Sequence, residues 1–178
     1  MCIRDRLWNE KTHFLENVYN NQYFETDWYG WCDIGYFRGR TCDLHVDLIK
    51  NWPNYNKIEK LDKKKIHYGN VNGNVERTYE IYRNIKKKNE KGLPIIQIPP
   101  DEIFIAAGFF LLYKDNINWW NFVHDEKLKL YMKHDYLVKD DQMIVLDNIV
   151  GHIPRIKIHT EFTNGVFDNW FMFQRILN

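Results

Sequence analysis

The spacing of apolar side chains along the chain predicts helices and strands in alternation. The first helix is predicted over residues 11–21, with Thr12 as its N-cap and apolar side chains at helical spacing: Phe14, Leu15, Val18 and Tyr19. The aromatic run 28–38 predicts a buried strand through 29–34. A second helix, with a basic end, is predicted after the turn-prone segment 69–74, from the spacing of Tyr79, Tyr82 and Ile85.

The best candidate for a core strand lies within the apolar run 102–113. A shorter apolar run, 93–98, precedes it, and the two are separated by Pro99 and Pro100. The longer run contains three small residues in succession, Ala106, Ala107 and Gly108. Small residues inside a buried strand indicate that a bulky group packs against it, or that a ligand approaches its backbone.

Two further helices and another strand are predicted toward the C-terminus. The first helix begins at Asp115 or Asn116 and ends near His134, with an inward stripe of Trp120, Val123, Leu128, Tyr131 and Met132. A helix at 143–150, a strand at 153–159 and an aromatic segment at 167–175 follow. Because no repeat or linker interrupts these elements, the pattern predicts a single α/β domain.

Composition narrows the class of protein. Hydrophobic residues make up 44% of the chain and charged residues 28%, which is typical of globular proteins. The net charge of +1 gives no general attraction to nucleic acid or to anionic membranes. No apolar run approaches the roughly 20 residues that a membrane span needs. The three cysteines form no Cys-x-x-Cys pair, so a reducing, cytoplasmic environment is expected.

Asp33 is the most informative polar residue, because the aromatic strand delivers its carboxylate out of apolar surroundings. An unpaired carboxylate there is costly or becomes protonated, so Asp33 should meet a cation, a metal ion or hydrogen-bond donors. Gly35, two residues later, allows a turn or the close approach of a ligand. The simpler alternative is that Asp33 caps a turn or pairs with Arg38 or Arg40.

Asp140, Asp141 and Gln142 form a second polar group, at a predicted helix N-terminus. Carboxylates at this position are favoured by the helix dipole, so a capping role is one interpretation. The same residues also suit a site in which one carboxylate accepts a proton from a hydroxyl group while its neighbour orients sugar hydroxyls.

Four segments, taken in their order along the chain, resemble the HtrL/YibB-type family of bacterial and viral proteins, which look like relatives of GT-A glycosyltransferases. They are Thr-Asp-Trp-Tyr-Gly-Trp-Cys-Asp-Ile-Gly at 26–35, Ala-Ala-Gly-Phe-Phe at 106–110, Asn-Trp-Trp at 118–120 and Lys-Asp-Asp-Gln at 139–142. The resemblance extends from about Lys11 to the C-terminus. It implies a GT-A-like mixed sheet flanked by helices, and transfer of a sugar from a nucleotide-sugar donor to a glycan or another hydroxyl acceptor.

The resemblance also implies roles for individual residues. GT-A enzymes use an Asp-x-Asp at a strand end to hold a divalent metal on the donor diphosphate. Asp33 stands at the first acid and would be the ligand of Mn²⁺ or Mg²⁺, whereas Gly35 replaces the second. Asp141 or Asp140 would be the base that deprotonates the acceptor. The implied substrate-binding residues are Trp31, Asp33, Gly35, Ala107, Gly108 and Gln142.

The N-terminal segment 1–6, Met-Cys-Ile-Arg-Asp-Arg, resembles translated sequencing-adaptor sequence of metagenomic reading frames. We therefore expect an artefactual leader followed by one domain at 7–178. GT-A folds place nucleotide-binding strands and helices before the acidic motif, but Asp33 follows only 32 residues here. The expectation is thus the C-terminal portion of a GT-A-like domain that lacks part of its N-terminal nucleotide-binding half, so that this chain alone need not be active.

Other interpretations concern acidic residues elsewhere in the chain. The alternation of Asp43, His45 and Asp47 predicts either a metal cluster or a solvated face of a short element. A metal-dependent nuclease would combine Asp62 and Lys64 with Asp43 or Asp47.

A further alternative is a non-catalytic carbohydrate-binding or assembly protein. It would use Trp119, Trp120 and Trp170 as stacking surfaces, although tryptophans at helical spacing more commonly belong to a core.

Overall fold

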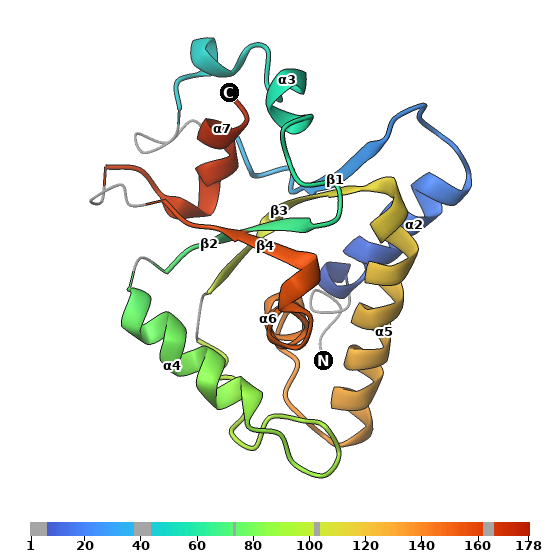
Figure 1. The fold of residues 1–178 in the computed structure, drawn as a ribbon, viewed down its shortest axis with the longest axis vertical. Helices are drawn as coiled ribbons and strands as arrows, with labels where there is room; N and C mark the ends of the chain where they lie inside the picture. Colours follow the sequence, from blue (N-terminus) through green and yellow to red (C-terminus); the bar gives the residue numbers. More distant parts are fainter. Residues whose placement is uncertain (1–6, 38–43, 73, 102–103, 162–165) are drawn as a thin grey trace.

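The computed structural model describes residues 7–37, 44–72, 74–101, 104–161 and 166–178, which form a four-stranded sheet with helices on both faces (Figure 1). The strand order is β1-β3-β2-β4, with bounds Trp28–Cys32, Ile105–Tyr113, Ile66–Asn70 and Ile156–His159. β3 pairs antiparallel with β1 and β2, and β2 pairs parallel with β4. The expected mixed α/β sheet is confirmed, and its assignment to the GT-A type stays a prediction.

The helices form two layers around this sheet. One face is covered by α2 (Lys11–Asn20), α4 (Val75–Lys86), α5 (Ile117–Lys133) and α6 (Asp141–Gly151) (Figure 1). The other face carries α3 (Tyr55–Ile58), α7 (Met172–Ile176) and the short 3₁₀ turn η4 (Asn169–Phe171). Three further 3₁₀ turns are η1 (Val46–Ile49), η2 (Lys114–Asn116) and η3 (Ile153–Arg155).

β3 is the centre of the core because both of its faces are buried. Phe110 and Leu112 pack on the side of α5 and α6, whereas Phe109 and Leu111 pack on the side of α7. Side chains of a strand alternate between its two faces, so a strand covered on both sides needs a continuous apolar run. This explains why the run at 102–113 gave the strongest strand signal in the sequence.

Several predicted boundaries differ from the structure. β1 ends at Cys32, so Asp33 lies just beyond the strand. Thr12 is buried inside α2, and Glu10 precedes the helix without making a side-chain cap hydrogen bond. The run 93–98 forms no strand and only an isolated bridge between Lys88 and Pro94. Pro94 within this run, and Pro99 and Pro100 directly after it, lack the N–H group that a strand ladder needs.

The inward stripe predicted for the long helix is correct in part. Trp120 and Tyr131 are buried, whereas Met132, beside Tyr131 in the sequence, is exposed. Successive residues of a helix point in directions about 100° apart, so Met132 turns away from the core.

A buried carboxylate fixes α6 against its neighbours. Asp147 is fully buried, and its Oδ2 accepts a hydrogen bond from the Tyr131 hydroxyl of α5 at 2.8 Å. Its Oδ1 lies 2.5 Å from Lys88 Nζ and 3.4 Å from Lys127 Nζ. A buried carboxylate needs such partners, so the position of α6 depends on these contacts.

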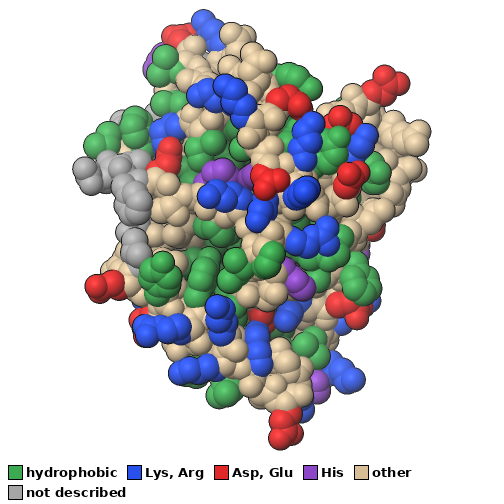
Figure 2. Space-filling model, viewed as in Figure 1, with side chains coloured by type: hydrophobic (Ala, Val, Ile, Leu, Met, Phe, Trp, Pro, Cys, Tyr) green, Lys and Arg blue, Asp and Glu red, His purple; other side chains and the backbone are tan. Residues whose placement is uncertain are grey.

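The surface carries charges of both signs. On the face shown in Figure 2, Lys and Arg side chains are spread among apolar and polar ones, with Asp and Glu between them. Within the described part of the chain, no helix combines the length and apolar character that a bilayer crossing requires.

Candidate functional site

Asp33 is held where β1 ends. Its backbone N–H donates to the Gly108 carbonyl oxygen at 2.8 Å, which continues the pairing of β1 with β3. Its Oδ1 accepts a hydrogen bond from the indole Nε1 of Trp31 at 2.5 Å. The carboxylate is 37% exposed, so the strand end presents it to a cavity rather than burying it.

Lys11 meets the expectation that Asp33 needs a positively charged partner. Its Nζ lies 3.5 Å from Asp33 Oδ1 and 3.1 Å from Asp141 Oδ2, and it donates to the Ala107 carbonyl oxygen at 2.9 Å. The Lys11 side chain is only 5% exposed. The buried ammonium group is therefore surrounded by two carboxylates and a backbone carbonyl oxygen. Arg38 and Arg40, the alternative partners, lie outside the described residues.

The two adjacent acids at the start of α6 have different tasks. Asp140 is the N-cap, and its Oδ1 accepts a hydrogen bond from the Gln142 N–H at 3.1 Å. Asp141 is the first residue of the helix and turns toward Lys11. Of the two predicted catalytic carboxylates, only Asp141 lines the cavity described below, because capping directs the Asp140 side chain back to the helix backbone.

Burial changes the protonation of both acids. It raises the pKa of Asp141 from 3.8 to about 6, against the opposing effect of the Lys11 ammonium group. Burial likewise raises the pKa of Asp140, with Lys139 acting in the opposite direction. At neutral pH Asp141 is mostly ionised, and its pKa lies closer to neutrality than that of an ordinary aspartate, as suits a general base.

A cavity of about 530 Å³, which we call the carboxylate cavity, opens between the end of β1, β3, α6 and η4. It brings together most of the predicted substrate-binding residues: Asp33, Gly35, Ala107, Gly108 and Gln142. Trp31 is not part of its lining and contributes through its hydrogen bond to Asp33. The Gln142 Oε1 atom is buried and accepts no hydrogen bond from the described residues, which leaves an acceptor available to a ligand.

Gly108 is required by the close packing at this point. A Cβ atom there would lie 2.9 Å from Trp170 Nε1 and 3.2 Å from Asp33 Oδ2. The small residue therefore allows Trp170 and Asp33 to approach the strand from the cavity side. The run of small residues indicated that a bulky group packs against this strand, and Trp170 is such a group.

Sequence reasoning did not assign Lys11, Trp8 or Asp168 to this site, although all three line the cavity. Trp170 was considered only as a stacking surface. The position of Lys11 in the sequence did indicate an acidic partner. A cation at the first position of a helix is disfavoured by the helix dipole, and a nearby acid compensates for this.

The carboxylate cavity carries an excess of negative charge. Its lining contains three carboxylates, from Asp33, Asp141 and Asp168, and one ammonium group, from Lys11. Among the described residues, no group of three or more His, Cys, Asp or Glu side chains is arranged to hold a metal ion. A cation at this cavity would therefore take only part of its ligands from the described residues.

The alternative acidic sites have local roles. His45 and Asp47 flank the start of η1 on the surface, where Asp47 pairs with Lys50 at 2.8 Å. Asp43 lies outside the described residues. Asp62 Oδ1 accepts a hydrogen bond from the Lys64 backbone N–H at 2.9 Å, which closes an exposed turn.

The three tryptophans proposed as stacking surfaces differ in their surroundings. Trp120 is buried and donates from Nε1 to the Tyr68 hydroxyl at 3.1 Å, so it offers no face to a sugar. Trp119 is partly buried, and the guanidinium carbon of Arg155 lies 3.7 Å from its ring centroid. Trp170 lines the carboxylate cavity.

Comparison of the chain with protein-family models, with curated proteins and with solved structures finds no match in any of the three.

Proposed function

We propose that the carboxylate cavity is the donor site of a glycosyltransferase of the GT-A type, which transfers a sugar from a nucleotide sugar to a hydroxyl acceptor. The observation that carries this proposal is the convergence of Asp33 and Asp141 on the single ammonium group of Lys11. These acids come from the end of a strand and the start of a helix far apart in the sequence. The order of the segments that resemble the HtrL/YibB-type family supports the same assignment.

Asp141 is the proposed general base. In an inverting transfer, its carboxylate accepts the proton of the acceptor hydroxyl while the hydroxyl oxygen bonds to the anomeric carbon of the donor sugar. The bond from that carbon to the diphosphate oxygen breaks, and the nucleoside diphosphate leaves with the electron pair. The raised pKa of Asp141 supports this role, since a base is most effective when its pKa lies near the working pH.

Lys11 is a positioning residue in this scheme. Its Nζ donates to the Ala107 carbonyl oxygen and lies between the carboxylates of Asp33 and Asp141, so its charge is already paired within the protein. It holds the two carboxylates at one side of the cavity and offsets part of their mutual repulsion.

Gln142 and Gly108 are the proposed contacts to the donor sugar. The buried Gln142 Oε1 can accept a hydrogen bond from a sugar hydroxyl. Gly108 lines the cavity through its backbone, because Trp170 and Asp33 fill the space that a side chain there would take.

A divalent cation fits the charge of this site. A diphosphate is negatively charged, and so is the lining of the carboxylate cavity, so the two need a cation between them. Mn²⁺ or Mg²⁺ would take Asp33 as its protein ligand and would supply positive charge to the departing diphosphate.

Release of nucleoside diphosphate from a panel of UDP-, GDP- and dTDP-sugars, with Mn²⁺ present, tests the proposal. We expect turnover of at least one donor, and a fall of about a hundredfold or more in Asp33→Asn, since a charge that acts on the transition state is lost. Asp27→Asn is the matched control, because Asp27 pairs with Lys114 outside the carboxylate cavity. Equal turnover by the native chain and Asp33→Asn would remove the basis of the assignment.

A further inference from the structure

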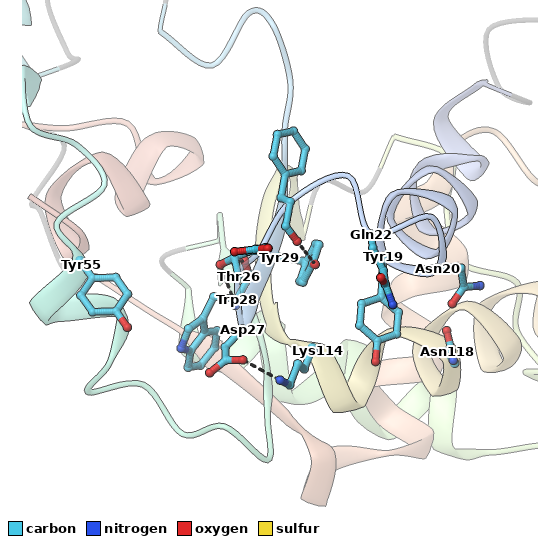
Figure 3. Close-up of a pocket in the computed structure, with 12 residues that line it drawn as sticks. Tyr19, Asn20, Gln22, Thr26, Asp27, Trp28, Tyr29, Tyr55, Lys114 and Asn118 are labelled. Atoms are coloured by element: carbon cyan, nitrogen blue, oxygen red, sulfur yellow. Dashed lines mark hydrogen bonds and ion pairs between the residues drawn. The ribbon is translucent and has the colours of Figure 1, made fainter.

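A second cavity, of about 890 Å³, lies at the opposite end of β1 from Asp33 (Figure 3). We call it the β1 cavity. It is enclosed by the end of α2, the segment that joins α2 to β1, and residues from α3, η2 and α5. In Figure 3, Tyr55 stands on one side, Tyr19, Gln22 and Asn118 stand on the other, and the pair of Asp27 and Lys114 lies between them.

The walls of the β1 cavity are fixed by hydrogen bonds. The Lys114 backbone N–H donates to the Asp27 carbonyl oxygen at 2.8 Å, which extends the sheet below the cavity. The buried Tyr29 donates from its hydroxyl to the Phe24 carbonyl oxygen at 3.1 Å, which ties the connecting segment to β1. The cavity is therefore built on the rigid sheet and not only on a loop.

The charges in the β1 cavity argue against an anionic ligand. Its lining carries a single cation, Lys114, which already forms an ion pair with Asp27 at 2.7 Å, and a further acid, Glu25. A phosphate or a nucleic acid would find no unpaired positive charge among the described lining residues. The rest of the lining consists of amide, hydroxyl and aromatic side chains, which suits an uncharged polar ligand.

Aromatic and amide groups give the β1 cavity the features that bind a sugar ring. Phe24 and Tyr55 line it and are 65% and 67% exposed, which leaves aromatic surface for the apolar face of a sugar. The side chains of Gln22 and Asn118 lie on the side of the cavity away from Tyr55 (Figure 3). Neither amide has a hydrogen-bond partner within the part of the chain that the structure describes, so both can donate to and accept from ligand hydroxyls.

The backbone conformation of Gln22 is a separate argument for a ligand in the β1 cavity. It ends α2 in the left-handed conformation, with φ of 53°, and its N–H donates to the Tyr19 carbonyl oxygen at 3.0 Å, while Tyr23 N donates to Val18 O at 3.3 Å. This pair of hydrogen bonds defines a helix end at which glycine is the usual residue. A side chain here costs about 1 kcal/mol of conformational strain, and in this chain that side chain faces the β1 cavity.

We propose that the β1 cavity binds a neutral oligosaccharide, stacked on Tyr55 and Phe24 and hydrogen-bonded by Gln22 and Asn118. This site is separate from the carboxylate cavity and does not require the transferase reaction.

Saturation-transfer NMR and titration calorimetry with maltopentaose, cellopentaose and N-acetylchitopentaose test this site. We expect at least one of these probes to bind, and Tyr55→Ala to weaken its binding about tenfold through loss of the stacking surface. Gln22→Gly is the sharper variant. It relieves the left-handed strain, so the chain stays folded with an unchanged or higher melting temperature, while loss of the amide raises Kd about fivefold.

Oligosaccharide binding in the β1 cavity and the proposed transferase activity can be tested separately. Asp33→Asn lies in the other cavity and should bind the oligosaccharide as the native chain does, even where nucleotide-sugar turnover is lost. The proposal is overturned if none of the three probes binds, or if Tyr55→Ala and Gln22→Gly both bind the probe as tightly as the native chain.

Discussion

Lys11 Nζ lies 3.1 Å from Asp141 Oδ2 in a buried ion pair that joins the start of α2 to the start of α6. Both residues stand at helix N-termini, where the helix dipole stabilises the carboxylate of Asp141 and disfavours the ammonium group of Lys11. The acids around Lys11 therefore compensate for its position. Their arrangement accounts for the burial of a lysine that would otherwise be expected on the surface.

Replacement of Lys11 by methionine should destabilise the protein by about 3–5 kcal/mol, because it leaves Asp141 buried without its cation. Urea unfolding at pH 7 measures this change. Lys114→Met is the matched control, since Lys114 forms an exposed pair with Asp27, and an exposed pair contributes much less to stability than a buried one. Equal losses in the two variants would show that Lys11 has no special role.

The contribution of Asp141 to stability should fall as the pH rises from about 4 to 6, whereas the buried His124 and His159, whose pKa values burial lowers to about 4, contribute in the opposite direction. Burial raises the pKa of Asp141 from 3.8 to about 6, so the folded state binds this proton more tightly than the unfolded state does. The resulting contribution is complete below the unfolded pKa and is lost as the pH passes through the folded one, a change of about 3 kcal/mol. The difference in unfolding free energy between the native chain and Asp141→Asn, measured at several pH values, follows this contribution.

Asp141→Asn isolates that contribution, because the asparagine does not titrate while the histidines titrate in both proteins. Carbon NMR of the Asp141 carboxyl group measures its pKa directly. In Lys11→Met the pKa of Asp141 should rise further, since the Lys11 ammonium group opposes the effect of burial. A pKa near 4 for Asp141 in the native chain would contradict this prediction.

Gly108→Ala should reduce nucleotide-sugar turnover strongly and cost about 1–3 kcal/mol of stability, because the new methyl group would push against Trp170 and Asp33. Turnover assays and thermal unfolding measure the two effects. Gly151→Ala provides the comparison, since a Cβ there meets no atom within 4 Å. If Gly108→Ala behaves like Gly151→Ala, the close packing at the cavity has no consequence for the reaction.

Removal of divalent metal by EDTA should abolish nucleotide-sugar turnover, and Mn²⁺ or Mg²⁺ should restore it, because the negative lining of the carboxylate cavity repels a bare diphosphate. The chelator should leave the melting temperature of the ligand-free protein unchanged, since the described residues form no protein-only metal cluster. Full turnover in EDTA would exclude the proposed cation.

The sequence predicted most helices and strands because their apolar spacing is regular, but it predicted their ends less well. The helix expected at Met143 begins at Asp141 in the structure. This shift of two residues decides that Asp140 caps the helix while Asp141 faces the cavity. No periodic pattern reports such a boundary, because capping depends on the backbone conformation of one residue.

The site itself was predictable only in part. Asp33 stood out because a charge in an aromatic run needs a partner, yet the partner, Lys11, lies on another element and is brought close only by the packing of α2 against β1 and α5. The link between Asp33 and Asp141 came from the order of the resembling segments, not from their spacing. Contacts between distant segments depend on tertiary packing, which local patterns do not encode.

β1 joins the two cavities, since Trp28 at its first position lines the β1 cavity and Asp33, just after its last, lines the carboxylate cavity. Five residues of extended strand span about 16 Å. A ligand that contacts both Trp28 and Asp33 must span about this length of strand, which a monosaccharide is too short to do.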